Sequence, residues 1–242
     1  MKITDFNKGI ICSSLGSFWW GFIGTYYFQY ITFVGTIEVV VHRCIWTSLM
    51  LLITTTFFNK WYLLKKIIFD KKKLLILLIT SILIFGNWSI WIYAVATNRI
   101  IDASFGYFIF PIISVFFGFL FFNEKLNKKR IISISLVIIS TIYLFFNLNS
   151  FPWIGFSVAF LWSIYNLLRK KINVDTDIGL FIESLFIFPI AIVIFYFIFQ
   201  NNMNDFSLSN PSLMPLLFLA GPMTVIPLFL YVKGVELSGL GP

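Results

Sequence analysis

The sequence has little charge, one histidine and two cysteines. Charged residues make up 12% of the 242 residues and hydrophobic residues 59%, whereas a soluble domain usually carries about 25% charged residues. The chain is therefore predicted to be a membrane protein. A single histidine rules out a metal centre built from several histidines, and Cys12 and Cys44 lack the spacing of a disulfide framework or a zinc site, so we expect them to pack.

Motifs for nucleotide and hydrolase chemistry are also missing. The sequence contains no G-x-x-x-x-G-K-[ST], no H-E-x-x-H and no G-x-S-x-G. An ATP-hydrolysing domain and the common hydrolase sites are therefore not expected, and neither is a cofactor or a metal ion.

Long apolar runs are what the sequence has instead. A membrane-spanning helix needs about 20 mainly apolar residues. About eight such segments are present, at 8–30, 34–58, 74–97, 101–122, 131–147, 151–168, 178–199 and 212–236. The first is too long and too aromatic for a signal peptide. The predicted fold class is an all-α membrane protein, a multi-pass helical bundle.

The net charge of +8 is distributed unevenly among the connections. Lysines and arginines gather at 60–73, 125–130 and 169–171, whereas the intervening connections contribute Arg99 alone. This asymmetry is typical of the positive-inside rule and predicts a cytoplasmic N-terminus. The basicity is thus explained by topology; the expected partner is the lipid bilayer, and nucleic-acid binding is not expected.

The chain also contains an internal repeat. Small residues recur at every fourth position, and short motifs recur in the same order: F-W-W-G at 18–21 and F-L-W-S at 160–163, Ile37-Glu38 and Ile182-Glu183, A-S-F-G at 103–106 and S-G-L-G at 238–241. The small-residue positions are Gly9, Ser13, Ser17, Gly21 and Thr25, then Gly155, Ala159 and Ser163. An odd number of spans separates the copies, so the second is predicted to be inverted, as in secondary transporters.

This repeat predicts the domain organisation. Residues 1–147 form a first unit of five helices, and residues 148–242 form an inverted second unit with three. By comparison with the first unit, two more helices are expected beyond Pro242.

Ionisable residues inside the second apolar segment are candidates for function, because charge within a bilayer is costly. Glu38 and His42 are four residues apart on one helix face and are predicted to interact and to sense protons. The alternative for Glu38 is an interfacial carboxylate that stabilises a helix start. Arg43 needs a partner: either a structural one, for which Glu183 is the candidate, or a carboxylate or phosphate of a solute. Glu183 is also expected, with Glu38 and His42, to belong to a proton-coupling or polar network.

A polar and aromatic group in the third and fourth segments is the other candidate. Asn87 needs a polar partner or a wet cavity within the bilayer. Trp88 and Trp91 share a helix face and are predicted to line a solute cavity together with Trp20 and Tyr107, although simple packing is the alternative. Pro111 removes a backbone donor and leaves the carbonyl of Tyr107 without its helical partner, which predicts a kink for gating or for packing.

Several of these strings resemble a known family. F-W-W-G-x-x-x-x-Y-Y at 18–27, E-V-V-V-H-R-C-I-W-T at 38–47, G-N-W-S-I-W-I-Y-A-V at 86–95, D-A-S-F-G-Y-F-I-F-P at 102–111 and I-E-S-L-F-I-F-P at 182–189 are similar to the RarD proteins of the EamA branch of the drug/metabolite transporter superfamily. The resemblance implies ten helices in two inverted repeats, a bacterial inner-membrane location and small organic solutes as substrates.

The leading hypothesis is therefore a secondary-active permease or exporter that works by alternating access, and not an enzyme. Two alternatives stay open: an intramembrane enzyme acting on lipid-like substrates with Glu38 and His42 as an acid/base pair, and a membrane scaffold that transports nothing. The sequence leaves the solute, the transport direction, the coupling ion and the oligomeric state open, a homodimer included.

Overall fold

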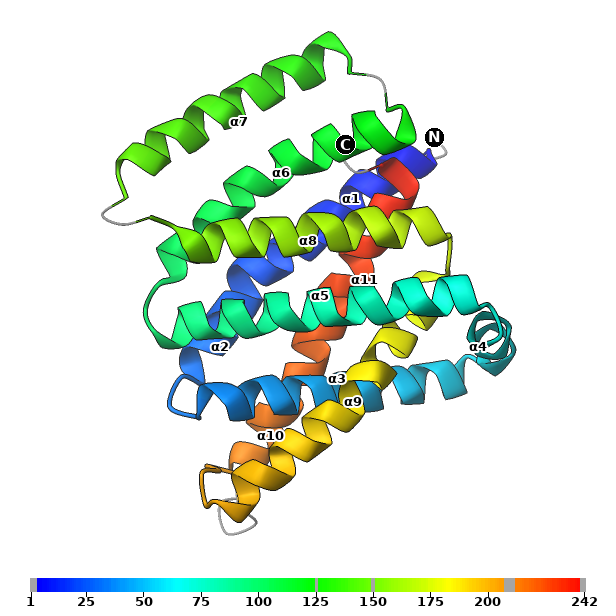
Figure 1. Ribbon diagram of the computed structural model, residues 1–242, viewed down its shortest axis with the longest axis vertical. Coiled ribbons are helices and arrows are strands. Elements are labelled where there is room, and N and C mark those ends of the chain that lie inside the picture. The colour runs from blue at the N-terminus through cyan, green and yellow to red at the C-terminus, as the bar shows by residue number, and fades with distance from the viewer. Residues whose placement is uncertain (1–3, 125, 149–150, 207–211, 240–242) are drawn as a thin grey trace.

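The chain folds into a bundle of helices (Figure 1). The computed structural model describes residues 4–124, 126–148, 151–206 and 212–239, and over these ranges it contains no strand. The elements are α1 Asp5–Phe18, η1 Trp19–Gly24, α2 Thr25–Tyr30, α3 Thr36–Phe57, α4 Trp61–Ile68, α5 Lys71–Ala96, α6 Ile100–Phe122, α7 Lys128–Phe146, α8 Trp153–Ile172, α9 Thr176–Gln200, α10 Leu213–Phe218 and α11 Ala220–Ser238. The prediction of an all-α fold is confirmed.

Within the described ranges, 6 helical runs are long and apolar enough to cross a membrane. They are α3, α5, α6, α7, α9 and the run from Leu213 to Ser238. The segments predicted at 8–30 and 151–168 are helical too, but the first is divided by the π-helical turn η1 and α8 ends in the charged sequence Arg169–Lys171. The prediction of eight spans is therefore not confirmed as a whole, and for these two helices it stays a prediction.

Helix ends follow ordinary capping rules. The side chains of Asp70 and Asn127 accept hydrogen bonds from backbone N–H groups in the first turns of α5 and α7, at 3.2 and 2.8 Å. At the other ends, every described residue with a left-handed backbone, apart from glycine, is an asparagine: Asn59, Asn98, Asn123, Asn173 and Asn202. Asparagine tolerates this conformation, so the chain can turn sharply after a helix.

Close helix crossings depend on small residues. Gly9 and Ser13 of α1 lie against Gly234 of α11, and a methyl group added to Gly106 of α6 would collide with the carbonyl oxygen of Gly155 on α8. The predicted small-residue positions on the first and sixth segments thus include real helix contacts. The remaining members of the first set, Ser17, Gly21 and Thr25, face a cavity instead.

The pairwise packing has a regular pattern. α1 packs on α11 and α8 packs on α5, while α3 crosses α9. α6 packs on α8, and α7 packs on α6 without burying any of its own residues. Cys44 is buried in the core and Cys12 is half-buried, and both are free thiols.

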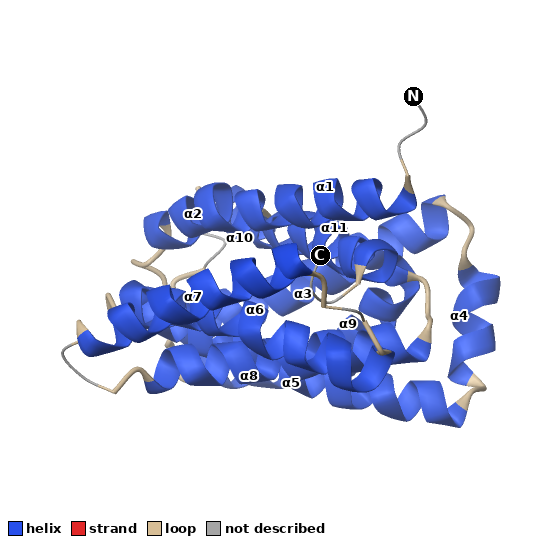
Figure 2. Cartoon of the chain, turned by 90° about the horizontal axis from the view of Figure 1, so that it is seen from above, coloured by secondary structure: helices blue, strands red, loops and turns tan. Residues whose placement is uncertain are grey.

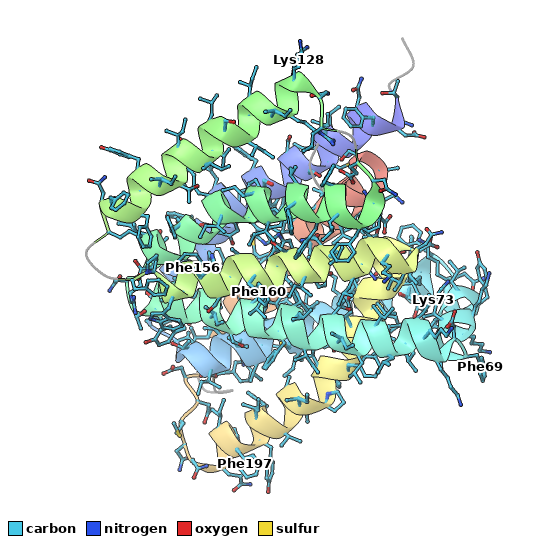
Figure 3. The ribbon with its side chains drawn as sticks, turned by 45° about the horizontal axis from the view of Figure 1, so that its top comes forward. Phe69, Lys73, Lys128, Phe156, Phe160 and Phe197 are labelled. Carbon is cyan, nitrogen blue, oxygen red and sulfur yellow. The ribbon has the colours of Figure 1, made fainter. Side chains whose placement is uncertain are left out.

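The outside of the bundle is apolar, and different helices lie at its two ends. Phe69, Phe160 and Phe197 are 84%, 57% and 58% exposed and are labelled among the outer side chains in Figure 3. α4 and the start of α1 lie at the same end of the bundle, and α2 ends at the other (Figure 2). A surface of this kind suits a lipid environment, and the shared end of α1 and α4 agrees with the predicted threading of the chain.

Candidate functional site

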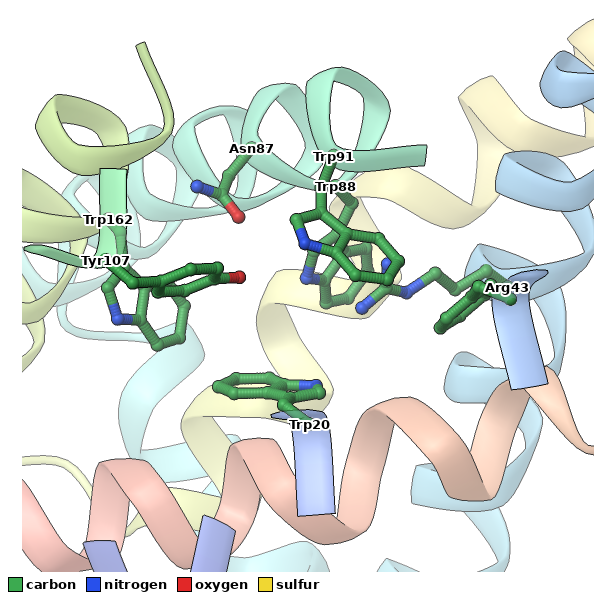
Figure 4. Close-up of a pocket in the computed structure, with 8 residues that line it drawn as sticks. Trp20, Arg43, Asn87, Trp88, Trp91, Tyr107 and Trp162 are labelled. Atoms are coloured by element: carbon green, nitrogen blue, oxygen red, sulfur yellow. The ribbon is translucent and has the colours of Figure 1, made fainter. Parts of the chain in front are cut away.

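Aromatic side chains and one arginine surround a pocket between α3, α5, α6, α8 and η1 (Figure 4). Its lining residues are Trp20, Phe28, Arg43, Asn87, Trp88, Trp91, Tyr107 and Trp162. The structure therefore brings together every residue that the sequence marked as substrate-binding. Phe28 and Trp162 are additions. Trp162 was recognisable in the sequence as the repeat counterpart of Trp20.

Arg43 is the only charged residue in this lining. Its side chain is buried, at 3% exposure, and Nε donates a hydrogen bond of 2.8 Å to Oγ1 of Thr224. The guanidinium carbon lies 4.5 Å from the ring centre of Trp88 and 5.0 Å from that of Phe28, within the range of cation–π attraction. The terminal Nη nitrogens make no hydrogen bond to the described part of the chain, and the group faces the pocket (Figure 4).

The structural partner predicted for Arg43 is wrong. Among the described residues no carboxylate forms an ion pair with Arg43. Glu183 instead faces α5 and α8, where it meets Thr80, Tyr165 and Arg169. Arg43 is therefore a buried cation whose protein contacts are a hydroxyl group and two aromatic rings.

Two polar groups point toward the same space as Arg43. The amide nitrogen of Asn87 donates to the carbonyl of Val158 at 3.1 Å, which leaves the amide oxygen directed into the pocket (Figure 4). The hydroxyl of Tyr107 points inward from the opposite side. The pocket thus offers guanidinium donors, an amide acceptor and a hydroxyl, all set in an aromatic wall.

The pocket has two compartments. The compartment at Arg43 measures about 30 Å³, which is room for a few water molecules or one small charged group. Trp20, Trp91, Tyr107 and Trp162 also line a cavity of about 530 Å³ that includes Pro111. That volume lies in the usual range for small-molecule sites. Pro111 sits within a continuous α6, and its predicted gating role stays a prediction.

The π-helical turn η1 shapes the wall of the larger cavity. Trp20 and Gly21 belong to this turn, and no atom lies within 4 Å of where a side chain on Gly21 would begin. π-Helical turns are rare in proteins as a whole, and those that occur are often found at functional sites. This turn was not predicted, because the segment has the sequence pattern of one continuous apolar helix.

Aromatic contacts connect this wall to a second polar centre. The ring of Trp20 meets that of Trp162 edge-on at 5.3 Å between centres, and Trp162 stacks on Tyr165 at 5.2 Å. The hydroxyl of Tyr165 then donates to Oε2 of Glu183 at 3.1 Å. One residue, Tyr165, therefore separates the pocket wall at Trp162 from a buried carboxylate.

That second centre is a buried ion pair. Glu183 is 2% exposed and accepts a hydrogen bond of 2.6 Å from Thr80. Nε of Arg169 lies 3.6 Å from the carboxylate, and Nη2 donates to the carbonyl of Thr176 at 3.1 Å. The guanidinium group lies against Gly179, where a side chain would overlap it.

Arg169 was wrongly assigned to a basic connection. It belongs to α8 and is only 3% exposed. A signal in the sequence could have shown this: Trp162, Tyr165 and Arg169 recur at spacings of three and four, which places them on one face of a helix. Lys170 and Lys171, by contrast, point away from that face.

Glu38 and His42 form a third group, outside both compartments of the pocket. Glu38 is 1% exposed and accepts hydrogen bonds from the backbone N–H groups of Asp205 at 2.7 Å and Phe206 at 2.9 Å. The Asp205 carboxylate accepts one from the N–H of Gly35 at 2.8 Å. This reciprocal pair of carboxylates joins the start of α3 to the segment after α9.

His42 lies beside Glu38, as the spacing predicted. Its Nε2 is 3.7 Å from Oε1 of Glu38, too far for a hydrogen bond. The ring packs edge-on against Phe195 and Phe206, at 5.3 Å between centres in each case. Glu38 lies in the first turn of α3 and binds a loop that the sequence alone could not bring to it. Stabilisation of the helix start and proton sensing by this pair both stay predictions.

Comparison with known proteins gives a consistent family. The EamA-like transporter family matches residues 7–146. An uncharacterized transporter of Vibrio cholerae is 32% identical over 240 residues, which cover 98% of this chain and 79% of that protein. Protein RarD of Escherichia coli is 30% identical over 244 residues, covering 100% and 82%, and the uncharacterized transporter YojE of Bacillus subtilis is 30% identical over 239 residues, covering 98% and 79%. No solved structure matches the chain.

Proposed function

Because the chain belongs to the EamA-like transporter family and is a RarD-type member of it, we propose that it is a secondary-active transporter of small organic solutes that carry an anionic group. Family membership and the apolar helices make it a multi-pass inner-membrane transporter of the drug/metabolite type. The solute class, its binding site and the alternating-access mechanism are the proposal.

The observation that carries the proposal is the unpaired charge of Arg43. The guanidinium group remains charged at any accessible pH, and burying a charge without a counter-ion costs several kcal/mol. Its contacts with Thr224, Trp88 and Phe28 offset part of that cost. An anionic solute would supply the missing partner, and the free Nη nitrogens have the planar fork that suits a carboxylate or phosphate.

Each of the two compartments would bind a different part of the solute. The compartment beside Arg43 has room for a carboxylate-sized group, and the larger cavity has room for an organic body. Trp20, Trp91 and Trp162 would hold that body by apolar and stacking contacts. The oxygen of Asn87 can accept a hydrogen bond from an N–H or O–H on the solute.

Alternating access is supported by the symmetry of the helix packing. The contact of α1 with α11 has its counterpart in the contact of α8 with α5, and α3 crosses α9, its own counterpart. Trp20 touches Trp162, which is its repeat counterpart. This is the arrangement expected of two inverted units at 1–147 and 148–242 with a site at their interface. The S-G-L-G match at 238–241 lies partly outside the described residues.

The intramembrane-enzyme hypothesis finds less support in the geometry. A general acid or base must reach the substrate, whereas the carboxylate of Glu38 is occupied by two backbone N–H groups and lies outside the pocket. The chain is accordingly proposed to be a carrier and not an enzyme.

A ligand screen tests the proposal. Purified protein is heated in the presence of organic carboxylates and of the matching primary amides, because a ligand that binds the folded state raises the apparent melting temperature. Carboxylates with an apolar body should stabilise the protein, and their amides should not.

Two variants assign the effect to the pocket. Arg43→Lys should keep the fold but weaken binding of the best carboxylate by about 10- to 100-fold, because an ammonium group does not replace a bidentate fork. Arg99→Lys, which is paired with Asp102 and is not among the lining residues of either compartment, is the matched control and should bind as the parent does. Equal stabilisation by carboxylates and amides, or unchanged affinity in Arg43→Lys, would overturn the proposal.

A further inference from the structure

We propose that the carboxylate of Glu183 is a proton-binding site, with Arg169 as its counter-ion, and that two aromatic side chains couple it to the solute pocket. The coupling rests on the proposed transport function, whereas proton binding at Glu183 does not.

The hydrogen bonds at Glu183 can accommodate both forms of the carboxyl group. Oε1 accepts from the hydroxyl of Thr80 at 2.6 Å and Oε2 from that of Tyr165 at 3.1 Å. A hydroxyl group can either donate or accept. When a proton from water is added to one carboxylate oxygen, the new O–H can donate to the neighbouring hydroxyl, which rotates, so the carboxyl group itself keeps hydrogen-bond partners in both forms.

Few charged groups lie near this site. On α8 Arg169 is the charged group and Tyr165 is a titratable but neutral one, and Glu236 of α11 lies within electrostatic range of Arg169. The other neighbours of Glu183 carry no charge: Thr47 and Leu51 of α3, Thr80, Ile84 and Trp88 of α5, and Val225 and Leu228 of α11. Protonation would therefore act mainly on Arg169.

Arg169 is poised to respond to the charge of Glu183. Its Nε and Nη1 atoms are buried without a hydrogen-bond partner in the described part of the chain, and Nη2 donates a single hydrogen bond, to the carbonyl of Thr176. Neutral Glu183 would leave this cation without its ion pair, which is strongly unfavourable in a buried site. The link between the end of α8 and the start of α9 should then loosen.

A route for the proton leads from one end of the bundle. A cavity of about 10 Å³ touches Glu183, room for about one water molecule. Leu51 and Val225 line both this cavity and a groove of about 390 Å³, whose lining also includes the ion pair between Lys60 and Asp177. Water in the groove would thus be one apolar constriction away from the carboxylate.

Two aromatic residues connect Glu183 with the solute pocket. Trp88 borders both the small cavity and the pocket, and its ring holds Arg43. Trp162 lines the pocket and stacks on Tyr165, which donates to Glu183. A solute that displaces either ring changes the surroundings of the carboxylate, and protonation has the reverse effect, as linkage requires.

Infrared difference spectroscopy of the purified protein tests the proton site without any solute. Lowering the pH should produce a C=O stretching band from a protonated carboxyl group in a dry environment. Glu183→Gln should reduce this band by the contribution of one carboxyl group per chain. Glu236→Gln, the matched control at the other carboxylate within electrostatic range of Arg169, should keep the full band. A titrating band of full size in Glu183→Gln would overturn the proposal.

A second variant covers a failure to fold. Glu183→Gln leaves Arg169 buried and unpaired, which is destabilising, whereas the double variant Arg169→Gln, Glu183→Gln removes both charges. The double variant should recover folded protein and should also lack the band. If it folds and the band persists, Glu183 is not the proton site.

Thiol labelling tests the route. In a background of Cys12→Ser and Cys44→Ala, Thr54→Cys in the groove should react with a membrane-impermeant maleimide added from the side of the basic segments. Ile53→Cys, one residue away on the exposed apolar surface, should not react. No labelling of Thr54→Cys from either side would refute the route. Neither measurement uses a solute, so a failure here leaves the solute-site proposal standing.

Discussion

Replacing each of the two buried arginines by glutamine should have opposite consequences. Arg43→Gln removes two cation–π contacts, each worth about 0.5–2 kcal/mol, and one charge-assisted hydrogen bond of about 1.5–3 kcal/mol. It also removes a buried charge that costs several kcal/mol and that no described carboxylate neutralises. These contributions nearly cancel, so the free energy of unfolding should change little.

Arg169→Gln has no such compensation. It leaves Glu183 as a buried carboxylate without its counter-ion, and breaking a buried pair in this way costs about 3–5 kcal/mol. For a chain of this size about 1 kcal/mol corresponds to about 2–4 °C in melting temperature. Arg169→Gln should therefore melt roughly 6–20 °C below the parent, and Arg43→Gln should melt within a few degrees of it.

The assay is thermal unfolding of the detergent-solubilised variants, followed by intrinsic tryptophan fluorescence. Binding of a stabilising carboxylate is measured on the same samples, and Arg43→Gln should abolish it. A loss of stability in Arg43→Gln as large as that in Arg169→Gln would show that Arg43 is a structural residue, and the argument from its unpaired charge would fail.

Further substitutions test a close helix crossing and the hydrogen bonds of Glu38. Gly106→Ala should sharply reduce the yield of folded protein, because the new methyl group collides with the backbone of Gly155; Gly21→Ala, which faces open space, should fold normally in the same expression test. Glu38→Gln should speed hydrogen exchange at the backbone N–H of Asp205, because an amide oxygen is a weaker acceptor than a carboxylate; unchanged exchange would show that the clamp contributes little. If Glu38 also senses protons, transport by this variant should lose its pH dependence, and a profile like the parent's would leave Glu38 with a purely structural role.

Much of the helix arrangement was predictable, because it depends on local sequence patterns such as apolar segments and regularly spaced small residues. Apolar segments of membrane-spanning length became helices with nearly the predicted bounds, and the small residues at Gly9 and Gly155 marked real helix crossings. Six of the eight pocket residues were also predicted, because an amide, an arginine and tryptophans are conspicuous within apolar segments.

The pairing of charges was not predictable. Arg43 and Glu183 were predicted to pair, yet their side chains face different helices, and sequence spacing does not say which faces of α3 and α9 meet. Arg169 was hidden for the opposite reason: it stands next to Lys170 and Lys171, and a run of cations reads as a solvated connection. Its position on the same face of α8 as the buried aromatic residues distinguishes it from the two lysines, and only the helical spacing of that face indicates this in the sequence.

The π-helical turn at Trp19–Gly24 has a consequence for how this chain could have evolved. A turn of this kind equals one residue added to an α-helix, and in a regular helix one residue corresponds to a rotation of about 100°. Deleting Gly21 would therefore convert the turn to regular helix and twist everything after it relative to α1. Gly16 could still pack against α11. Tyr27, however, would be rotated away from α10, and its hydroxyl could no longer donate the 2.6 Å hydrogen bond to the carbonyl of Leu216. A single inserted codon would thus have been enough to let α1 pack on α11 while Tyr27 of α2 contacts α10. Among single-residue deletions in the first thirty positions, those along 19–24 should therefore be the least tolerated.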